Sequence, residues 1–205
     1  MSFYEDHIFP PVMEWATKAF RRQIGELIGQ ARGRVLEIGA GTGANLSFYQ
    51  DGVEEVVGIE PVEAMLDKAR RLARDQRPGI SVTLTTGDAR ALPFAEAEFD
   101  TVVACLVFCT IPQPELAAQE AFRVLKPGGR LVFFEHVASK HKPTRFLQNQ
   151  LNPVWRKLAC GCELNRDTRA LFEEAGFRYE AIDDFVHAKV PAPMAPIITG
   201  IAIKP

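Results

Sequence analysis

The sequence predicts an α/β fold with a doubly wound, mostly parallel sheet of seven strands and helices on both faces. Short apolar runs alternate with helix-forming segments from residue 34 to residue 135, which is typical of a parallel sheet. The first run, Val35-Leu36-Glu37-Ile38, leads directly into a turn with glycine at every second position. The last two runs, 177–185 and 197–203, have no crossover helix between them, which predicts an antiparallel pair at one edge.

Each element follows from the spacing of its apolar residues. Apolar runs predict strands, and apolar residues three and four positions apart predict helices. The predicted strands are 34–38, 55–59, 81–85, 100–105, 130–135, 177–185 and 197–203. The predicted helices are 11–29, 62–75, 114–125, 144–158 and 166–175, with a short helical stretch at 44–49. The helix 114–125 is expected to stop at Lys126-Pro127-Gly128-Gly129, where proline and glycine end it.

Length and composition fit one domain over 1–205, in which 1–30 form an N-terminal helix or lid and 137–165 a substrate-side insertion. Of the 205 residues, 47% are hydrophobic, which is enough for one full core. The 24 basic and 26 acidic residues are well mixed, so bulk charge does not indicate binding to nucleic acid. We expect a monomer.

Targeting features and cysteines favour the cytoplasm. Residues 1–7 are acidic and lack the apolar core of a signal peptide, and no apolar stretch approaches the roughly 18 residues of a membrane span. The four cysteines do not form a disulfide framework, so we expect a reducing compartment. Cys160-Gly161-Cys162 has no second pair and is weak as a metal site, which leaves a structural or a redox role open and predicts no metal.

The turn after the first strand indicates a ligand. Gly39, Gly41 and Gly43 let the backbone bend tightly and let a ligand approach where a side chain would block it. A phosphate-binding loop has the spacing G-x-G-x-x-G. In that frame Asn45-Leu46 lie near the position where the third glycine belongs, so the turn does not match a phosphate-binding loop. Glu37 inside the strand end suits a cationic amino-acid group, and the whole motif suits S-adenosylmethionine. Taken alone, such a turn is equally compatible with a structural role.

Two later loops at the same predicted sheet edge add to this interpretation. Glu60-Pro61 ends the second strand, where an acidic residue roughly 20 residues past the glycine turn is placed to accept both ribose hydroxyls of an adenosine. Capping of the next helix by Glu60 is compatible with this role. Asp88, in Gly87-Asp88-Ala89, is placed to accept the adenine amino group, and the N–H of Ala89 to donate to the ring.

These motifs resemble those of class I S-adenosylmethionine-dependent methyltransferases, which have a Rossmann-like seven-stranded sheet, over essentially the whole chain. The string Arg123-Val124-Leu125-Lys126-Pro127-Gly128-Gly129 is similar to the branch that includes ubiquinone and menaquinone methyltransferases. A closer resemblance, in 41–49, 134–137, 152–155 and 161–162, is to methyltransferase-like proteins that S-methylate alkyl thiols. Members of that family carry an apolar N-terminal membrane anchor, which we do not expect here.

The resemblance implies S-adenosylmethionine as cofactor and S-adenosylhomocysteine as product. The candidate cofactor-binding residues are Tyr4, Glu37, Gly39, Ala40, Gly41, Gly43, Asn45, Glu60, Pro61, Met65, Gly87, Asp88, Ala89, Cys105, Leu106 and Phe108. Phe108 would form part of an apolar floor under the sulfonium. Residues 3–15 are expected to fold over the cofactor as a lid, and a helix that only packs on the sheet is the alternative.

The acceptor is expected near the ends of the fourth and fifth strands. The candidate pocket residues are Phe9, Cys109, His136 and Trp155. An oxygen acceptor would want a general base, for which His136 with Glu135 is the catalytic candidate. A loop histidine bonded to the backbone is the alternative for His136, and a cap or a pair with Lys140 is the alternative for Glu135. Cys105 and Cys109 could instead be small buried hydrophobes.

The helix 144–158 has an apolar side with three interpretations. Phe146, Leu147, Leu151, Trp155 and Leu158 recur at helical spacing, and we expect them to face the core. They could instead wall an apolar substrate pocket. They could also lie on a membrane surface, surrounded by Lys142, Arg145, Arg156 and Lys157.

Methyl transfer from a sulfonium chiefly requires alignment of donor and nucleophile and exclusion of water. A thiol acceptor needs little more, because a free thiol has a pKa of about 8.5. We therefore expect transfer to a small, fairly apolar acceptor, with a thiol as the leading candidate. The alternatives are O- or C-methylation of a quinol or phenol, N-methylation of a phospholipid amine head group, and a binding module that keeps the cofactor without turnover.

Overall fold

The computed structural model describes residues 18–74, 80–188 and 190–205. The strands are β1 (Gly33–Ile38), β2 (Val53–Glu60), β3 (Ser81–Thr86), β4 (Phe99–Cys105), β5 (Leu125–His136), β6 (Arg178–Val186) and β7 (Pro196–Ile203). The α-helices are α2 (Arg21–Ile28), α3 (Glu63–Arg74), α4 (Pro114–Val124), α5 (Lys142–Leu158) and α6 (Thr168–Glu174), and the 3₁₀ helices are η2 (Lys18–Phe20) and η3 (Leu46–Phe48). Within these described ranges, no helix combines the length and apolar character needed to cross a bilayer.

The strands form one seven-stranded sheet in the order β3-β2-β1-β4-β5-β7-β6. The pairs from β3 through β5 are parallel, whereas β7 runs antiparallel to both β5 and β6. The predicted mostly parallel sheet with an antiparallel pair at one edge is therefore confirmed. Strands β2 and β3 lie on one side of β1 and β4 lies on the other, so the winding direction changes between β1 and β4. Ligands of open α/β sheets bind at the carboxyl ends of strands at such a point.

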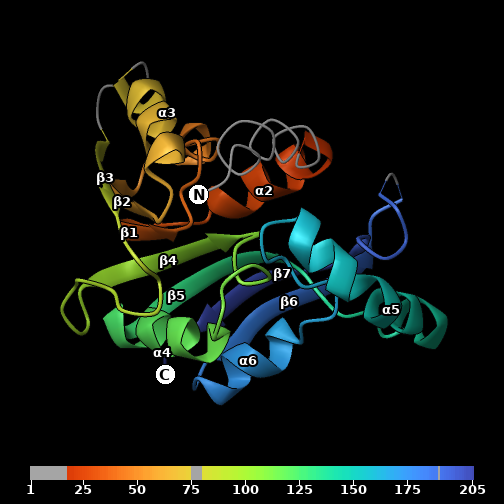
Figure 1. Ribbon diagram of the computed structural model, residues 1–205. Coiled ribbons are helices and arrows are strands. Elements are labelled where there is room, and N and C mark those ends of the chain that lie inside the picture. The colour runs from red at the N-terminus through yellow and green to blue at the C-terminus, as the bar shows by residue number, and fades with distance from the viewer. Residues whose placement is uncertain (1–17, 75–79, 189) are drawn as a thin grey trace.

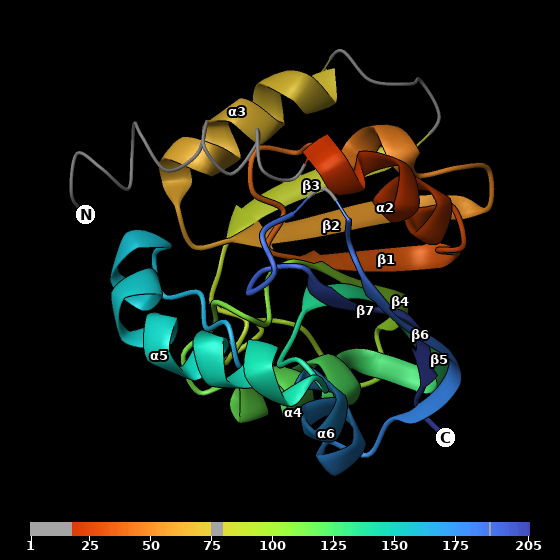
Figure 2. The same ribbon diagram turned by 90° about the vertical axis from the view of Figure 1, so that its right-hand side faces the viewer.

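Helices cover both faces of the sheet. Figures 1 and 2 show α2 and α3 over one face and α4 and α6 over the other. Neighbouring strand residues point to opposite layers: Val35 and Val103 pack with α2, and Leu36 and Val102 pack in the layer of α4. The inner strands are apolar on both sides, which is why they read as continuous apolar runs in the sequence.

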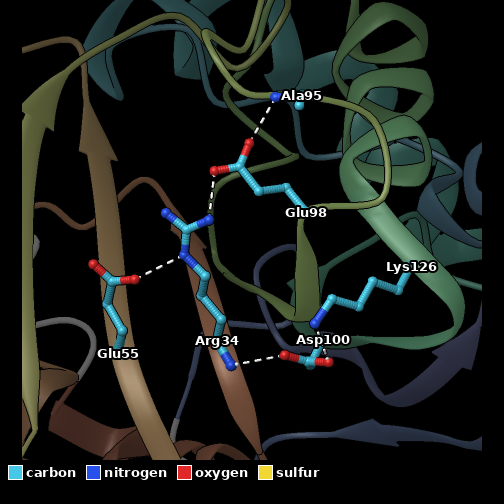
Figure 3. A network of polar contacts seen from close by, with 6 residues as sticks. All are labelled: Arg34, Glu55, Ala95, Glu98, Asp100 and Lys126. Carbon is cyan, nitrogen blue, oxygen red and sulfur yellow. Dashed lines mark hydrogen bonds and ion pairs between the residues drawn. The ribbon is translucent and has the colours of Figure 1, made fainter.

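A polar network joins the amino ends of four strands, β1, β2, β4 and β5 (Figure 3). The Arg34 guanidinium on β1 donates to Glu55 of β2 at 2.7 Å and also binds Glu98, just before β4. The backbone N–H of Arg34 donates to the Asp100 carboxylate at 2.9 Å, and Lys126 donates to the other oxygen of Asp100 at 2.7 Å. The network therefore fixes the strand starts, opposite the edge where a ligand is expected.

Several element boundaries differ from the prediction. The helix expected at 114–125 ends at Val124, and β5 begins at Leu125, where residues 126–129 were expected to be a turn. Residues 126–129 form a bulge at this end of β5, between Leu125, which pairs with Phe99, and Arg130, which pairs with Thr101. Backbone hydrogen bonds with Lys204 hold the bulge in place: the N–H of Gly128 donates to Lys204 at 2.8 Å, and the N–H of Lys204 donates to Gly129 at 3.0 Å. Of the helix predicted over 11–29, residues 11–17 lie outside the described residues. The stretch expected at 44–49 is helical only over η3.

The expectation that the apolar side of α5 faces the core is wrong. Phe146, Leu147, Leu151 and Leu158 are exposed, Trp155 is half-buried, and Gln148 is the fully buried residue of this helix. The Gln148 side chain accepts from the N–H of Ser139 at 2.8 Å and donates to the carbonyls of Val137 and Pro193. A polar contact with the loops after β5 and before β7 therefore orients α5, and the apolar stripe turns outward.

Candidate active site

A cavity of about 500 Å³ lies at the carboxyl ends of β1, β2, β3 and β4, where the winding direction changes. Nine of the predicted cofactor residues line it: Gly39, Glu60, Pro61, Met65, Gly87, Asp88, Ala89, Cys105 and Leu106. This volume is in the range of pockets that hold a small molecule or cofactor. Residues from the ends of four strands far apart in the sequence therefore meet at one cavity.

The glycine turn after β1 is held against β2. The N–H groups of Gly39 and Ala40 both donate to the Ile59 carbonyl at 2.9 Å. A Cβ on Gly39 would come within 2.5 Å of Val107, so only glycine allows the two loops to approach this closely. Gly41 has a φ of +54°, and among the described residues a Cβ there would meet only the Gly39 carbonyl oxygen, at 3.9 Å. The open space beside Gly41 is room that a ligand could use.

Glu60 at the end of β2 is placed between the cavity and two backbone segments. One carboxylate oxygen accepts from the N–H of Gly41 at 3.1 Å, and the other accepts from the N–H of Val62 at 3.0 Å. Burial raises the pKa of Glu60, and these two hydrogen bonds oppose the rise. Each carboxylate oxygen can accept a further hydrogen bond, so contact with a ribose and capping before α3 are compatible.

Glu37 is buried behind the cavity and does not line it. Its carboxylate accepts from the Asn45 amide at 2.7 Å and from the Tyr49 hydroxyl at 3.0 Å. Burial raises the pKa of Glu37 to about 7, against the effect of these two hydrogen bonds. Tyr49 is a site residue that the sequence reasoning missed, because a buried phenol is indistinguishable there from a core aromatic.

Asp88 lines the cavity and is already paired. Its carboxylate binds the Arg90 guanidinium, with the shortest contact at 2.6 Å, and this hydrogen bond lowers the pKa of Asp88. Arg90 also lines the cavity and donates to Gln113 at 3.2 Å. An adenine bound at Asp88, as predicted, would therefore face a carboxylate and a guanidinium together. Arg90 was not predicted, although its place two residues after Asp88 makes the pair possible.

The loop after β4 supplies the apolar wall of the cavity. Leu106 has a φ of +56° and turns the chain, so that Leu106 and Val107 line the cavity together with Ile111. Phe108 was expected as the apolar floor, but its fully buried ring packs on Phe172 at a centroid distance of 4.9 Å. The floor role predicted for Phe108 is therefore wrong, and Val107 takes the place at the wall.

Glu135 supports this loop from beneath and has no exposure to the cavity. Its carboxylate accepts from the backbone N–H groups of Val107 at 2.9 Å, Phe108 at 3.0 Å and Cys109 at 3.3 Å. Burial raises the pKa of Glu135 to about 8, opposed by these three hydrogen bonds. The capping alternative matches this arrangement. The pairing alternative is wrong, because Lys140 pairs with Asp184 at 3.0 Å.

His136 belongs to a buried cluster beside the cavity rather than to its wall. Its Nε2 lies 3.1 Å from the Pro193 carbonyl oxygen, which matches the alternative of a histidine bonded to the backbone. Cys162 lies beside Cys109, His136 and Trp155, and these neighbours, Cys109 above all, lower the pKa of the Cys162 thiol to about 5. Cys162 therefore interacts with Cys109, whereas Cys160 lines the cavity. Among the described residues, no group of three or more His, Cys, Asp and Glu side chains could hold a metal ion.

The remaining predicted site residues are behind the cavity wall or outside the described residues. Ala40, Gly41, Gly43 and Asn45 belong to the glycine loop but do not line the cavity, and neither do Cys109, His136 and Trp155. Tyr4, Phe9 and the lid proposed at 3–15 lie outside the described residues. The lining residues that were not predicted are Ile38, Ile59, Val62, Arg90, Val107, Thr110, Ile111, Pro112 and Cys160.

The residues present fit S-adenosylmethionine. The open side of Gly41 leaves space for a ligand. Two carboxylates lie near the glycine loop: Glu60 lines the cavity, and Glu37 is buried behind it. Glu60 and the Asp88–Arg90 pair would hold the nucleoside end, and Glu37 would stabilise the cationic amino-acid end. Apolar side chains at Leu106 and Val107 complete the other wall.

Comparison with known proteins agrees with this geometry. The family model described as "Methyltransferase domain" matches residues 36–133. The human thiol S-methyltransferase TMT1B is 35% identical over 198 residues, which cover 94% of this chain and 80% of that protein. The phosphatidylethanolamine N-methyltransferase of Cereibacter sphaeroides is 35% identical over 131 residues, which cover 64% of each chain.

A solved structure supports the fold. The N-methyltransferase NodS from Bradyrhizobium japonicum, in complex with S-adenosyl-L-homocysteine, superposes with a TM-score of 0.69 and 16% sequence identity, over 92% of this chain and 87% of that one. The match spans the whole sheet and not only the glycine loop. Together with the identity to TMT1B over nearly the full length, it places the chain in the family of class I S-adenosylmethionine-dependent methyltransferases.

Proposed function

We propose that this methyltransferase transfers a methyl group to the sulfur of a small, apolar thiol. When bound, S-adenosylmethionine supplies an electrophilic methyl group on its sulfonium. The observation that carries the proposal is the wall after β4, where Leu106, Val107 and Ile111 line the cavity while His136 stays buried behind it. Because none of these three wall residues can act as a base, the wall suits an acceptor that does not require one.

The titratable side chains support the same acceptor. Among the described residues that line the cavity, these are Glu60, Asp88, Arg90, Cys105 and Cys160. Glu60 is bonded to two backbone N–H groups and Asp88 to Arg90, and burial raises the pKa of Cys105 well above its usual range. A thiol ionises more readily than an alcohol and its thiolate is a strong nucleophile, so this acceptor does not require one of them as a base. The name of the relative TMT1B, a thiol S-methyltransferase, supports the same class.

The wall residues contribute by position and by exclusion of water. Leu106 and Val107 are set by the turn at Leu106 and by the hydrogen bonds from Glu135. Their apolar side chains keep water from the attacking sulfur and restrict its approach, and alignment of this kind is the main demand of an in-line displacement. We also propose the cytoplasm as the place of action, because thiols remain reduced there.

The test is formation of S-adenosylhomocysteine with a small alkyl thiol in excess, against a blank without acceptor. Product above the blank, and mass-spectrometric detection of the methyl thioether, are the expected results. The same assay with a phenol, a quinol and phosphatidylethanolamine separates the alternatives. Transfer to one of these and none to the thiol, in protein that binds the cofactor, would overturn the thiol assignment.

A further inference from the structure

Helix α5 exposes an apolar stripe along its outer side. The exposed fractions are 66% for Phe146, 42% for Leu147, 43% for Leu151 and 61% for Val154. At the helical spacing of these positions, the four side chains fall on one side of α5. Single exposed apolar residues are ordinary, but a contiguous stripe of four on one helix indicates an interaction surface.

The charge of α5 is of one sign. The helix carries Lys142, Arg145, Arg156 and Lys157 and contains no acidic residue. Within the described part of the chain, Arg156 lies 3.7 Å from Glu163, and Lys142, Arg145 and Lys157 form no ion pair. On the helix, Lys142 lies one turn before Phe146 and Lys157 one turn after Val154, so basic residues border the stripe at both ends. An apolar stripe beside unpaired basic residues is complementary to an anionic, apolar-backed surface.

The position of α5 connects this surface with the cavity. Figures 1 and 2 show α5 across the carboxyl edge of the sheet, outside the helix layers that cover its faces. Two residues after its last residue, Leu158, comes Cys160, which lines the cavity. A molecule that meets the outer side of α5 is therefore next to the loop that borders the site.

We propose that the stripe formed by Phe146, Leu147, Leu151 and Val154 docks the protein on the surface of an anionic lipid bilayer. The apolar side chains enter the boundary between head groups and acyl chains, and the basic residues remain at the lipid phosphates. A second copy of this chain is disfavoured as the occupant, because it would bring four basic residues against four. Resting on the proposed function, docking here would give the cavity access to apolar thiols dissolved in the membrane.

The test is co-sedimentation of the full chain with vesicles. One set consists of phosphatidylcholine, and the other of phosphatidylcholine and phosphatidylserine in equal amounts. The protein is expected to sediment with the second set and to be released by salt, because attraction between basic side chains and anionic lipids is screened. The double variant F146S/V154S is expected to stay in the supernatant, whereas Leu116→Ser on α4, at 42% exposure, is expected to bind like the original protein.

A charge series tests the basic residues separately. The variant K142E/K157E is expected to lose at least about 25-fold in partition onto anionic vesicles, since one basic residue contributes about fivefold. The double variant K68E/R71E on α3 has the same charge change away from α5 and is the matched control. Each variant is also assayed with a water-soluble thiol, and unchanged transfer there shows that the site is intact.

The outcomes distinguish this inference from the proposed function. Vesicle binding that F146S/V154S or K142E/K157E leaves unchanged would overturn the docking surface, and so would sedimentation that depends only on residues 1–17. Failure to sediment, with a dimer in solution that F146S/V154S dissolves, would assign the stripe to a second copy instead. Loss of transfer to the soluble thiol in the unsubstituted protein would overturn the thiol proposal and leave the vesicle result standing.

Discussion

Glu60 at the end of β2 accepts a hydrogen bond from the backbone N–H of Gly41 at 3.1 Å, so one carboxylate joins the glycine loop to the next strand. The same carboxylate lines the cavity. The residue proposed to bind the ribose is therefore also a support of the loop that the cofactor approaches.

Replacement of Glu60 by alanine is expected to weaken cofactor binding by about 1.5–3 kcal/mol, the cost of losing hydrogen bonds to a charged group. Isothermal titration with S-adenosylhomocysteine measures this change. Glu54→Ala, at an exposed position of the same strand, is the control and is expected to bind normally. Unchanged affinity in Glu60→Ala would mean that Glu60 only supports the backbone.

Gly41→Val is expected to abolish cofactor binding, because a branched side chain occupies the open side of the loop and disfavours the φ of +54°. Gly128→Val is the matched control, because Gly128 has a φ of +75° in open space far from the cavity. Both variants should lose stability through backbone strain, measured by thermal unfolding. Only Gly41→Val should lose binding, and a folded Gly41→Val protein that binds normally would contradict the loop assignment.

Cofactor affinity is expected to rise with pH up to about 7 and then level off, because the pKa of Glu37 is raised to about 7 and the carboxylate form stabilises a cationic group. Below that pH, binding must first remove the proton from Glu37. Titration calorimetry at several pH values measures the slope. Glu37→Gln should bind weakly with no slope in this range, and an equal slope in both proteins would assign the titration to another group.

Glu135→Gln is expected to lower the free energy of unfolding by about 1–3 kcal/mol below pH 4.5, since the amide places an NH2 group where one of the two oxygens accepts from the backbone N–H groups of the loop after β4. The folded pKa of Glu135, about 8, lies above the ordinary value of 4.5, so protonation favours the folded state. The stability that Glu135 contributes is therefore full below pH 4.5 and declines as pH rises toward 8. Urea unfolding at several pH values should show the difference between the two proteins shrinking over this interval.

His136→Ala is expected to leave kcat/KM for a soluble thiol within about threefold and to lower stability by about 0.5–1.5 kcal/mol, the net value of one hydrogen bond. The reason is that Nε2 of His136 binds the Pro193 carbonyl, and the ring does not line the cavity. Steady-state kinetics with the thiol and with a phenol measure the effect. A loss above a hundredfold with the thiol would restore His136 as a catalytic base.

The parts of the fold that follow a local rule could be predicted from the sequence. The glycine turn, the acidic strand end at Glu60 and the apolar run of β4 each depend on neighbours in the chain, and the structure brings their loops to one cavity. The start of β5 could not be predicted, because the bulge at residues 126–129 is held by Lys204, far away in the sequence. The pairing of Asp88 with Arg90 could not be predicted either, because it depends on the conformations of the two side chains.

Helical spacing located the apolar stripe of α5 but could not say which way it points. Periodicity identifies the side of a helix that differs from the rest, whereas the neighbours decide whether that side meets protein. In α5 the orientation is set by Gln148, whose amide forms hydrogen bonds with the loop after β5 and the loop before β7. These contacts turn Gln148 inward and leave the apolar stripe on the outer side. At Phe108, likewise, the turn at Leu106 sends the ring into the core.

The polar network of Arg34, Glu55, Glu98 and Asp100 lies at the amino ends of the strands, whereas the cavity lies at their carboxyl ends (Figure 3). Because these groups lie at the amino ends, we expect a substitution among them to change the thermal stability of the protein and to leave the ligand-binding edge of the sheet unchanged. Durability and chemistry can thus vary independently in this chain. An engineer who needs a hardier enzyme can work at Arg34 and its neighbours without altering what the enzyme recognises.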